Sequence, residues 1–204
     1  MEISESYQTL EGESEGFYKE KGSKFIGIAV PCFDEEQAKS FLEEWKKQHH
    51  SARHLCYAYR FGVEKTNYRA NDDGEPNNSA GAPILGQIQS FDLTNVLVGV
   101  VRYYGGTKLG VGGLINAYRT AAKEAIEAGK ICTRTLHRFI ELRFNYAQMP
   151  DVMNEVKMQA IEIVQQEFEI DCYLKIAVPL SSEELIMERL QRIHELKIKQ
   201  LEVK

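Results

Sequence analysis

The stretch VVRYYGGTKLGVGGLINAYRTAA, residues 100–122, decides the fold of the first part of this chain. An apolar run over residues 96–101 leads into it and predicts a buried strand. From Leu114 onward, apolar residues recur at i, i+3, i+4 spacing, which predicts an amphipathic helix that ends before Gly129. Between strand and helix we expect a loop over residues 102–113, rich in glycine: Gly105, Gly106, Gly110, Gly112 and Gly113.

Such a loop is suited to anion binding. Its backbone N–H groups and the positive end of the following helix dipole point at one place, and Arg102, Tyr103 and Lys108 add charge and an aromatic ring. Two known phosphate-binding motifs do not fit. A dinucleotide fingerprint begun at Gly110 would need glycine at Ile115, and a P-loop would need Lys-Ser or Lys-Thr after its last glycine. Two interpretations stay open: an anion or RNA-backbone site, and a tight turn whose glycines serve positive φ and packing.

A second polar stretch, residues 71–85, reads NDDGEPNNSAGAPIL. Its carboxylates, Asp72, Asp73 and Glu75, could hold Mg²⁺ or act as acid and base. Because Asp-Gly and Glu-Pro are also turn dipeptides, a solvated turn is the competing interpretation. Pro83 suits the first position of a short helix, whose apolar face would be Ile84, Leu85, Ile88 and Phe91.

The composition is that of a soluble globular protein with one large domain or two small ones. The chain has 204 residues, of which 43% are hydrophobic and 27% charged. Its net charge of −5 argues against a protein that binds polyanions through a basic overall field. Any contact with nucleic acid would therefore need a local basic patch.

The sequence predicts neither a signal peptide nor a membrane helix. Residues 1–17 are acidic and lack the pattern of a signal peptide, and no apolar run reaches the ~20 residues of a membrane helix. The four cysteines contain no C-x-x-C pair, which argues against a zinc ribbon or redox motif and fits reduced thiols. We therefore expect a cytoplasmic protein with no membrane partner.

Other elements of the first part follow from local patterns. Asp34 and Gln37 form a capping-box signal for a helix with the apolar face Ala38, Phe41, Leu42 and Trp45. The helix ends near His49-His50, which suit either a metal site or contact with the negative helix end. Strands are expected at residues 24–30, 55–61 and 67–69.

A boundary is expected at residues 130–136, because the pattern then changes to β-α-β-β-α-β. The strands of this second part are expected at residues 138–145, 162–169, 172–178 and 198–203, and its helices at residues 149–159 and 181–194. A turn at Ile170-Asp171 would join the two middle strands. This is the element order of a ferredoxin-like sandwich. No cluster of potential catalytic groups occurs in it, so we interpret it as a binding or spacing module.

Residues 71–85 and 100–118 together resemble the signature of the IMPACT/YigZ family. KGSKFIG at residues 21–27 and SARHLCYAYR at residues 51–60 support the resemblance, which covers roughly residues 1–135. The remaining part is similar to the second domain usual in the bacterial branch. The sequence departs from the family pattern in two places: Asn77-Asn78-Ser79 stands where a Ser/Gly-Thr-like sequence is common, and Ala82 where a basic residue often sits.

The resemblance implies an α+β protein of two domains, residues 1–135 and 137–204. The first would be similar to domain 2 of ribosomal protein S5, as in domain IV of elongation factor G, and the second to the ferredoxin-like domain V of that factor. Eukaryotic relatives are known as regulators of translation under amino-acid stress, acting through protein partners of an initiation-factor kinase pathway. For the bacterial branch the resemblance implies no particular reaction.

If the two signature segments face one another, they form a cleft with mixed charge. Asp72, Asp73 and Glu75 would line one side, and the other side would hold Arg102, Tyr103, Lys108 and the glycine backbone. Such a cleft suits a phosphate-sugar backbone with a stacked base or a Mg²⁺-dependent phosphoryl site. His54 could be a general base there, or a structural histidine hydrogen-bonded beneath the loops.

Three functions therefore remain in view. The first is a non-catalytic module linked to translation, binding RNA, the ribosome or a translation factor through residues 71–82 and 102–113. The second is an enzyme or switch acting on a small phosphorylated ligand, the only case in which we expect a cofactor, Mg²⁺. The third is a protein-binding adaptor in which the glycine loop only shapes a surface. The sequence leaves the oligomeric state open.

Overall fold

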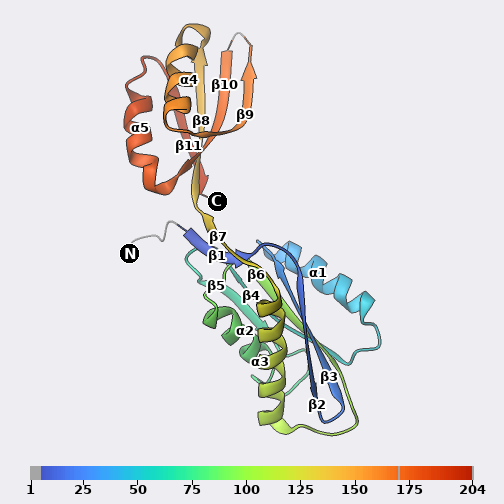
Figure 1. Cartoon of the computed structure of the whole chain (residues 1–204). Helices are drawn as coiled ribbons and strands as arrows, with labels where there is room; N and C mark the ends of the chain where they lie inside the picture. Colours follow the sequence, from blue (N-terminus) through green and yellow to red (C-terminus); the bar gives the residue numbers. More distant parts are fainter. Residues whose placement is uncertain (1–5, 170, 204) are drawn as a thin grey trace. The chain divides into compact units, whose positions relative to one another are not determined.

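The structure, a computed structural model, describes residues 6–169 and 171–203. Residues 1–5, at the start of the acidic stretch, and Ile170, in the expected turn, lie outside the described residues. The chain divides into two compact units, residues 1–134 and 135–204 (Figure 1). The described residues form three sheets together with α-helices, so the fold is mixed α and β.

The first unit is built on a five-stranded antiparallel sheet in the order β2-β3-β6-β4-β5. Along the chain these strands are β2 (Ser14–Glu20), β3 (Ser23–Pro31), β4 (His54–Phe61), β5 (Asn67–Asn71) and β6 (Val96–Tyr103). A separate two-stranded sheet pairs β1 (Ser6–Leu10) with β7 (Ile131–Thr135). The sequence predicted none of β1, β2 and β7, and β7 occupies most of the stretch expected as a boundary.

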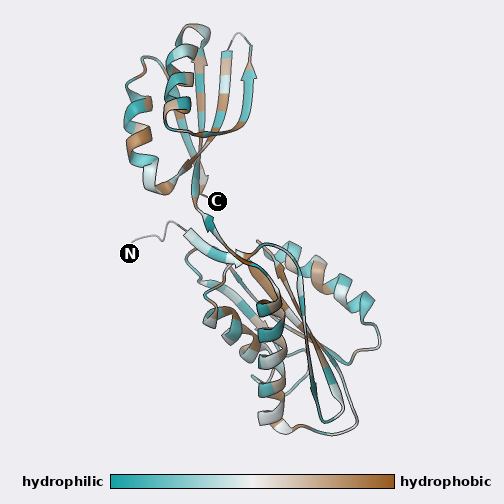
Figure 2. Ribbon diagram, in the orientation of Figure 1, coloured by the Kyte–Doolittle hydropathy of each residue, from teal (hydrophilic) through white to brown (hydrophobic). Residues whose placement is uncertain are grey.

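Helices cover both faces of this sheet. Helix α1 (Glu35–Gln48) packs on one face, while α2 (Gly81–Ser90) and α3 (Gly110–Ala128) pack on the other. Because side chains alternate along a strand, β6 sends Val98 and Val100 toward α2 and α3, and Leu97 and Val101 toward α1. A central strand buried on both faces explains the continuous apolar run, and Figure 2 shows apolar residues gathered along the middle of this sheet.

Helix α1 begins where the capping signal predicts. Asp34 Oδ1 accepts a hydrogen bond from the backbone N–H of Gln37 at 2.8 Å, and the side chain of Gln37 accepts one from the N–H of Phe33 at 3.1 Å. At the other end, His49 Nδ1 lies 2.9 Å from the hydroxyl of Tyr103. The described residues contain no group of three His, Cys, Asp or Glu arranged to hold a metal ion, so the metal interpretation of His49-His50 gains no support.

The second unit has the predicted order β-α-β-β-α-β. Its elements are β8 (His137–Asn145), α4 (Met149–Met158), β9 (Glu162–Phe168), β10 (Asp171–Pro179), α5 (Glu183–Gln191) and β11 (Lys197–Val203), with short 3₁₀ helices η1 (Tyr146–Gln148) and η2 (Leu180–Ser182). The sheet order is β11-β8-β10-β9, all antiparallel. Apolar residues of β8 and β10 form the core with α4 and α5, and Figure 2 shows apolar and polar bands alternating along β8.

Two whole-chain findings bear on the sequence analysis. In the described part of the chain, no helix has the length and apolar character needed to cross a membrane. All four cysteines are free thiols: Cys32, Cys56 and Cys172 are buried, and Cys132 is half-buried.

Candidate functional site

Three neighbouring strands of the first unit place His54, Arg102 and Phe25 side by side. Arg102 on β6 pairs in register with His54 on β4 and with Phe25 on β3. All three side chains therefore project from the face of the sheet that α2 and α3 cover. The ring of Tyr118 on α3 meets Phe25 edge to face, with ring centroids 5.2 Å apart. The strand ends thus carry His54 and Arg102 close to α3.

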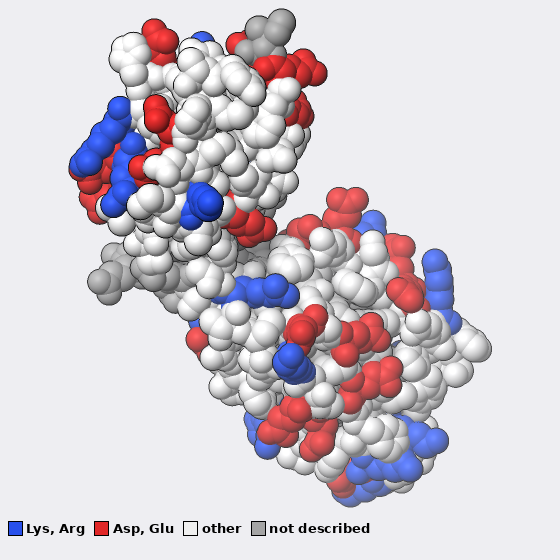
Figure 3. Space-filling model, turned by 45° about the horizontal axis from the view of Figure 1, so that its top comes forward, with Lys and Arg blue, Asp and Glu red and all other residues white. Residues whose placement is uncertain are grey.

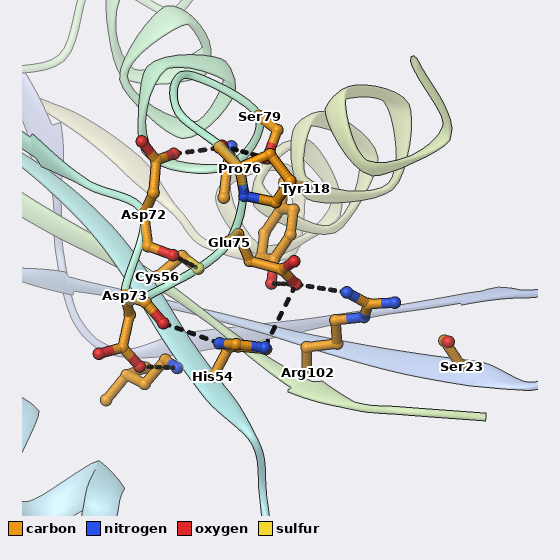
Figure 4. Close-up of polar contacts among 12 residues, drawn as sticks. Ser23, His54, Cys56, Asp72, Asp73, Glu75, Pro76, Ser79, Arg102 and Tyr118 are labelled. Carbon is orange, nitrogen blue, oxygen red and sulfur yellow. Dashed lines mark hydrogen bonds and ion pairs between the residues drawn. The ribbon is translucent and has the colours of Figure 1, made fainter. Parts of the chain in front are cut away.

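Glu75 connects these groups. Its Oε1 accepts hydrogen bonds from Arg102 Nη1 at 2.5 Å and from the Tyr118 hydroxyl at 2.8 Å, and lies 4.0 Å from His54 Nε2. Figure 4 shows Glu75 reaching from its loop toward His54, Arg102 and Tyr118, which come from two strands and a helix. Glu75 and Arg102 are both buried, so the ion pair fixes the loop against the sheet.

Asp72 shapes the loop that carries Glu75. Its carboxylate accepts hydrogen bonds from the backbone N–H groups of Asn78, Ala80 and Gly81, at 2.8 to 2.9 Å. Asp73 Oδ2 accepts one from the N–H of Leu55 at 2.7 Å. The expectation that both carboxylates line a cleft with Arg102 and Lys108 is therefore wrong: they bind backbone groups and hold the loop in place.

His54 supports the same loop from below. Its Nδ1 lies 2.7 Å from the backbone carbonyl oxygen of Asp73. Because a carbonyl oxygen only accepts hydrogen bonds, Nδ1 carries the proton and Nε2 faces Glu75. His54 thus has the contacts expected of a structural histidine beneath the loops, while its ring also lines the cavity described next.

The two signature segments meet at a cavity of about 470 Å³. It is lined by Arg53, His54, Gly74, Glu75, Pro76, Arg102, Tyr104, Lys108, Leu109, Gly110, Val111 and Leu114. Of the acidic residues singled out in the sequence, Glu75 alone lines it, together with Lys108 and Arg102. We call this space, with its lining residues, the Glu75 cavity.

The glycine-rich segment is only partly a loop. Arg102 and Tyr103 belong to β6, and α3 starts at Gly110, so the expectation that Gly110, Gly112 and Gly113 lie in the loop is wrong. Gly105 and Gly106 do lie in it. Gly105 packs against the β2–β3 hairpin, where an added Cβ would stand 1.9 Å from the carbonyl carbon of Gly22. Close packing therefore requires glycine at this position.

Neither close packing nor a positive φ requires glycine at position 112. Its φ is not positive, and an added Cβ would meet no atom of the described residues within 4 Å. In a helix, glycine is about 1 kcal/mol less favourable than alanine. The residue therefore lowers helix stability and leaves the first turn of α3 open to close approach. The N-cap, Leu109, is apolar, and its side chain cannot accept a hydrogen bond from that turn.

Three cationic side chains line the cavity. Arg53 and Lys108 are exposed, and the guanidinium of Arg102 lies 5.5 Å from the centroids of both the Phe25 and the Tyr104 rings. Arg102 Nε is buried and has no hydrogen-bond partner in the part of the chain that the structure describes. Figure 3 shows Lys and Arg side chains gathered at the lower end of this unit.

The geometry does not favour a magnesium centre. Asp72 and Asp73 accept backbone hydrogen bonds, and Glu75 is paired with Arg102. A hard cation needs several free oxygen ligands at once. The three carboxylates expected to hold Mg²⁺ therefore do not form a ligand set.

Sequence analysis missed two members of the site, Tyr118 and Cys56. Burial raises the pKa of both groups above their ordinary values. The Tyr118 hydroxyl donates to Glu75, and the Cys56 thiol donates to the backbone carbonyl of Asp72 at 3.0 Å. One signal was available for Tyr118: a hydroxyl on an otherwise apolar helix face requires a buried partner.

Known proteins are similar to this chain over most of its length. A family model described as the Impact N-terminal domain matches residues 21–126. IMPACT family member YvyE of Bacillus subtilis is 35% identical over 152 residues, which cover 74% of this chain and 70% of that protein. IMPACT family member YigZ of Escherichia coli is 30% identical over 161 residues, covering 78% of this chain and 79% of that protein.

One solved structure is similar to this chain over nearly its whole length. This structure, titled a hypothetical protein, is 26% identical with a TM-score of 0.76 and covers 98% of this chain and 99% of that chain. Another, of the two-domain translational regulator Yih1, is 26% identical with a TM-score of 0.37 over 59% of this chain and 48% of that chain. The family model covers more than half of the sequence, and the bacterial relatives match most of it. The chain therefore belongs to the IMPACT family.

Proposed function

We propose that this protein is a translation-associated binding module whose Glu75 cavity takes the phosphate backbone of RNA, free or on the ribosome. Family membership supports the link to translation, because the resemblance implies that eukaryotic members regulate it. The proposal includes no chemical step on the RNA. We also propose that the protein resembles elongation factor G, with an S5-like first unit and a ferredoxin-like second unit. The sheet order β11-β8-β10-β9 supports the ferredoxin-like second unit.

One observation carries the proposal: the open first turn of α3 and three cationic side chains line one cavity. Gly110 begins the 19-residue helix, and Arg53, Arg102 and Lys108 line the same space. A helix N-terminus presents unpaired N–H groups and partial positive charge, which favour phosphate. The guanidinium of Arg102 is itself paired with Glu75, so among the described residues the exposed Arg53 and Lys108 are the free cations of this lining.

An aromatic side chain completes the match to a nucleotide. Tyr104 lines the cavity and is 43% exposed. Base stacking on such rings tolerates any sequence, because every base has a π-face. The acidic net charge of −5 then limits binding to this local patch. We therefore expect modest affinity and strong dependence on salt.

The experiment is sedimentation with ribosomes and with total RNA after crosslinking. Wild type should co-sediment with RNA-containing particles, and Lys108→Ala should lose most of this binding. Lys39→Ala is the matched control, because Lys39 is an exposed lysine on α1, on the opposite face of the sheet. Co-sedimentation that is insensitive to Lys108→Ala would favour the protein-binding adaptor, and the absence of any RNA or ribosome binding would overturn the proposal.

A further inference from the structure

We propose that Glu75 accepts a hydrogen bond from the ribose 2′-hydroxyl of the bound strand and so makes the cavity select RNA over DNA. This inference rests on the proposed function and adds a specificity-determining residue to it. It starts from an asymmetry within one carboxylate. Oε1 is engaged by both Arg102 and Tyr118, whereas Oε2 receives no hydrogen bond from any residue that the structure describes, although Glu75 lines the cavity.

The free oxygen is held rigidly. Tyr118 donates to Oε1 from α3 and Arg102 from β6, and the side chain of Glu75 is only 5% exposed. A carboxylate only accepts hydrogen bonds. Oε2 is therefore left to accept a hydrogen bond from a donor group of whatever fills the cavity.

The rest of the cavity requires the same ligand to be anionic, since Arg53, Arg102, Lys108 and the first turn of α3 attract negative charge. A bare phosphate would be repelled by Glu75. A ribonucleotide strand satisfies both demands, because a 2′-hydroxyl donor stands next to each 3′-phosphate. DNA carries the same phosphates but lacks that donor, and the 2′-hydroxyl is the group by which proteins distinguish the two.

A guanine edge also offers N–H donors to a carboxylate. We infer the ribose instead because the exposed ring beside the cavity, Tyr104, provides stacking that is tolerant of sequence. The two cases differ in a measurable way. Recognition of the ribose would strengthen the binding of every RNA strand, whereas recognition of guanine would strengthen only the binding of strands that contain guanine.

The test varies the sugar of the ligand first and the protein second. Short oligouridylates with 2′-hydroxyl, 2′-deoxy or 2′-fluoro sugars compete for wild-type protein in fluorescence anisotropy. We expect the 2′-hydroxyl strand to bind about tenfold more tightly than the other two, because fluorine and hydrogen cannot donate to Oε2. Glu75→Gln, checked for folding by urea unfolding, should reduce this preference. Lys108→Ala should weaken all three strands alike.

The outcomes separate the inference from the proposed function. If the three strands bound equally and Lys108→Ala weakened all of them, the proposed role of Glu75 would be wrong, but the phosphate site would be supported. A sugar preference that arises only with guanine-containing strands would also overturn it. If neither RNA nor DNA bound in a Lys108-dependent way, the proposed function itself would fail.

Discussion

Arg102 and Glu75 form a buried ion pair, with Nη1 2.5 Å from Oε1 and side chains only 7% and 5% exposed. The pair joins the end of β6 to the loop before α2. Its position shows that Arg102 is a structural residue as well as a cavity-lining one. Removing either partner leaves the other charge buried without compensation, which is strongly destabilising.

Arg102→Ala should therefore lower the free energy of unfolding by about 3–5 kcal/mol. Urea unfolding followed by fluorescence measures this change. Arg119→Ala serves as the control, because Arg119 is exposed on α3, and surface substitutions typically change stability by less than about 0.5 kcal/mol. An Arg102→Ala protein as stable as the control would show that the ion pair does not hold the loop.

Gly105→Ala should also destabilise the first unit. An added Cβ would stand 1.9 Å from the carbonyl carbon of Gly22, so the loop and the β2–β3 hairpin must move apart. Overpacking of this kind costs about 1–3 kcal/mol. Gly12→Ala is the matched control, since its Cβ would meet no described atom within 4 Å. Equal unfolding midpoints for the two variants in urea would contradict the packing described here.

Gly112→Ala should have opposite effects on the stability of the protein and on its RNA binding. We expect a gain of up to about 1 kcal/mol in the free energy of unfolding together with weaker RNA binding, because the methyl group enters the space beside the first turn of α3. Gly86→Ala in α2 is the control, since an added Cβ there also meets no described atom within 4 Å. Thermal unfolding and anisotropy measure the two effects. Unchanged RNA affinity in Gly112→Ala would count against close ligand approach at α3.

The buried cysteines should resist alkylation in the folded protein. Burial raises the pKa of the Cys32 thiol to about 11 and also raises the pKa of Cys56. The thiolate is the reactive form, so both should stay unlabelled by iodoacetamide even at about pH 9. The half-buried Cys132 should be labelled first. Mass spectrometry of the native and urea-unfolded protein checks this order, and early labelling of Cys56 would indicate that the loop above it opens.

The sequence predicted the elements whose signals are local. A continuous apolar run marked β6, and the Asp34–Gln37 capping box marked the start of α1. It missed β2, in which exposed residues alternate with half-buried ones, and it missed β1 and β7, two segments far apart in the sequence that pair with each other. Pairing of this kind depends on the whole fold, and a pattern read along the chain does not reveal it.

The candidate site, too, could be predicted only in part from the sequence. Family motifs brought Glu75, Arg102 and Lys108 into one hypothesis, and the structure places all three on one cavity. The orientation of Asp72 and Asp73 was not predictable, because their hydrogen bonds to backbone N–H groups exist only in the folded loop. A carboxylate in a sequence looks the same whether it faces a ligand or a neighbouring backbone.

The most direct test of RNA-phosphate binding at the Glu75 cavity is a salt titration of single-stranded RNA binding by wild type, Lys108→Ala and Lys39→Ala. Lys108 is exposed in the loop before α3, so its removal should leave folding nearly unchanged. We predict weaker binding and a dependence of log K on log salt that is shallower by about 0.7 in Lys108→Ala, with Lys39→Ala matching wild type. Identical affinities and slopes for all three proteins would contradict a phosphate contact at this cavity.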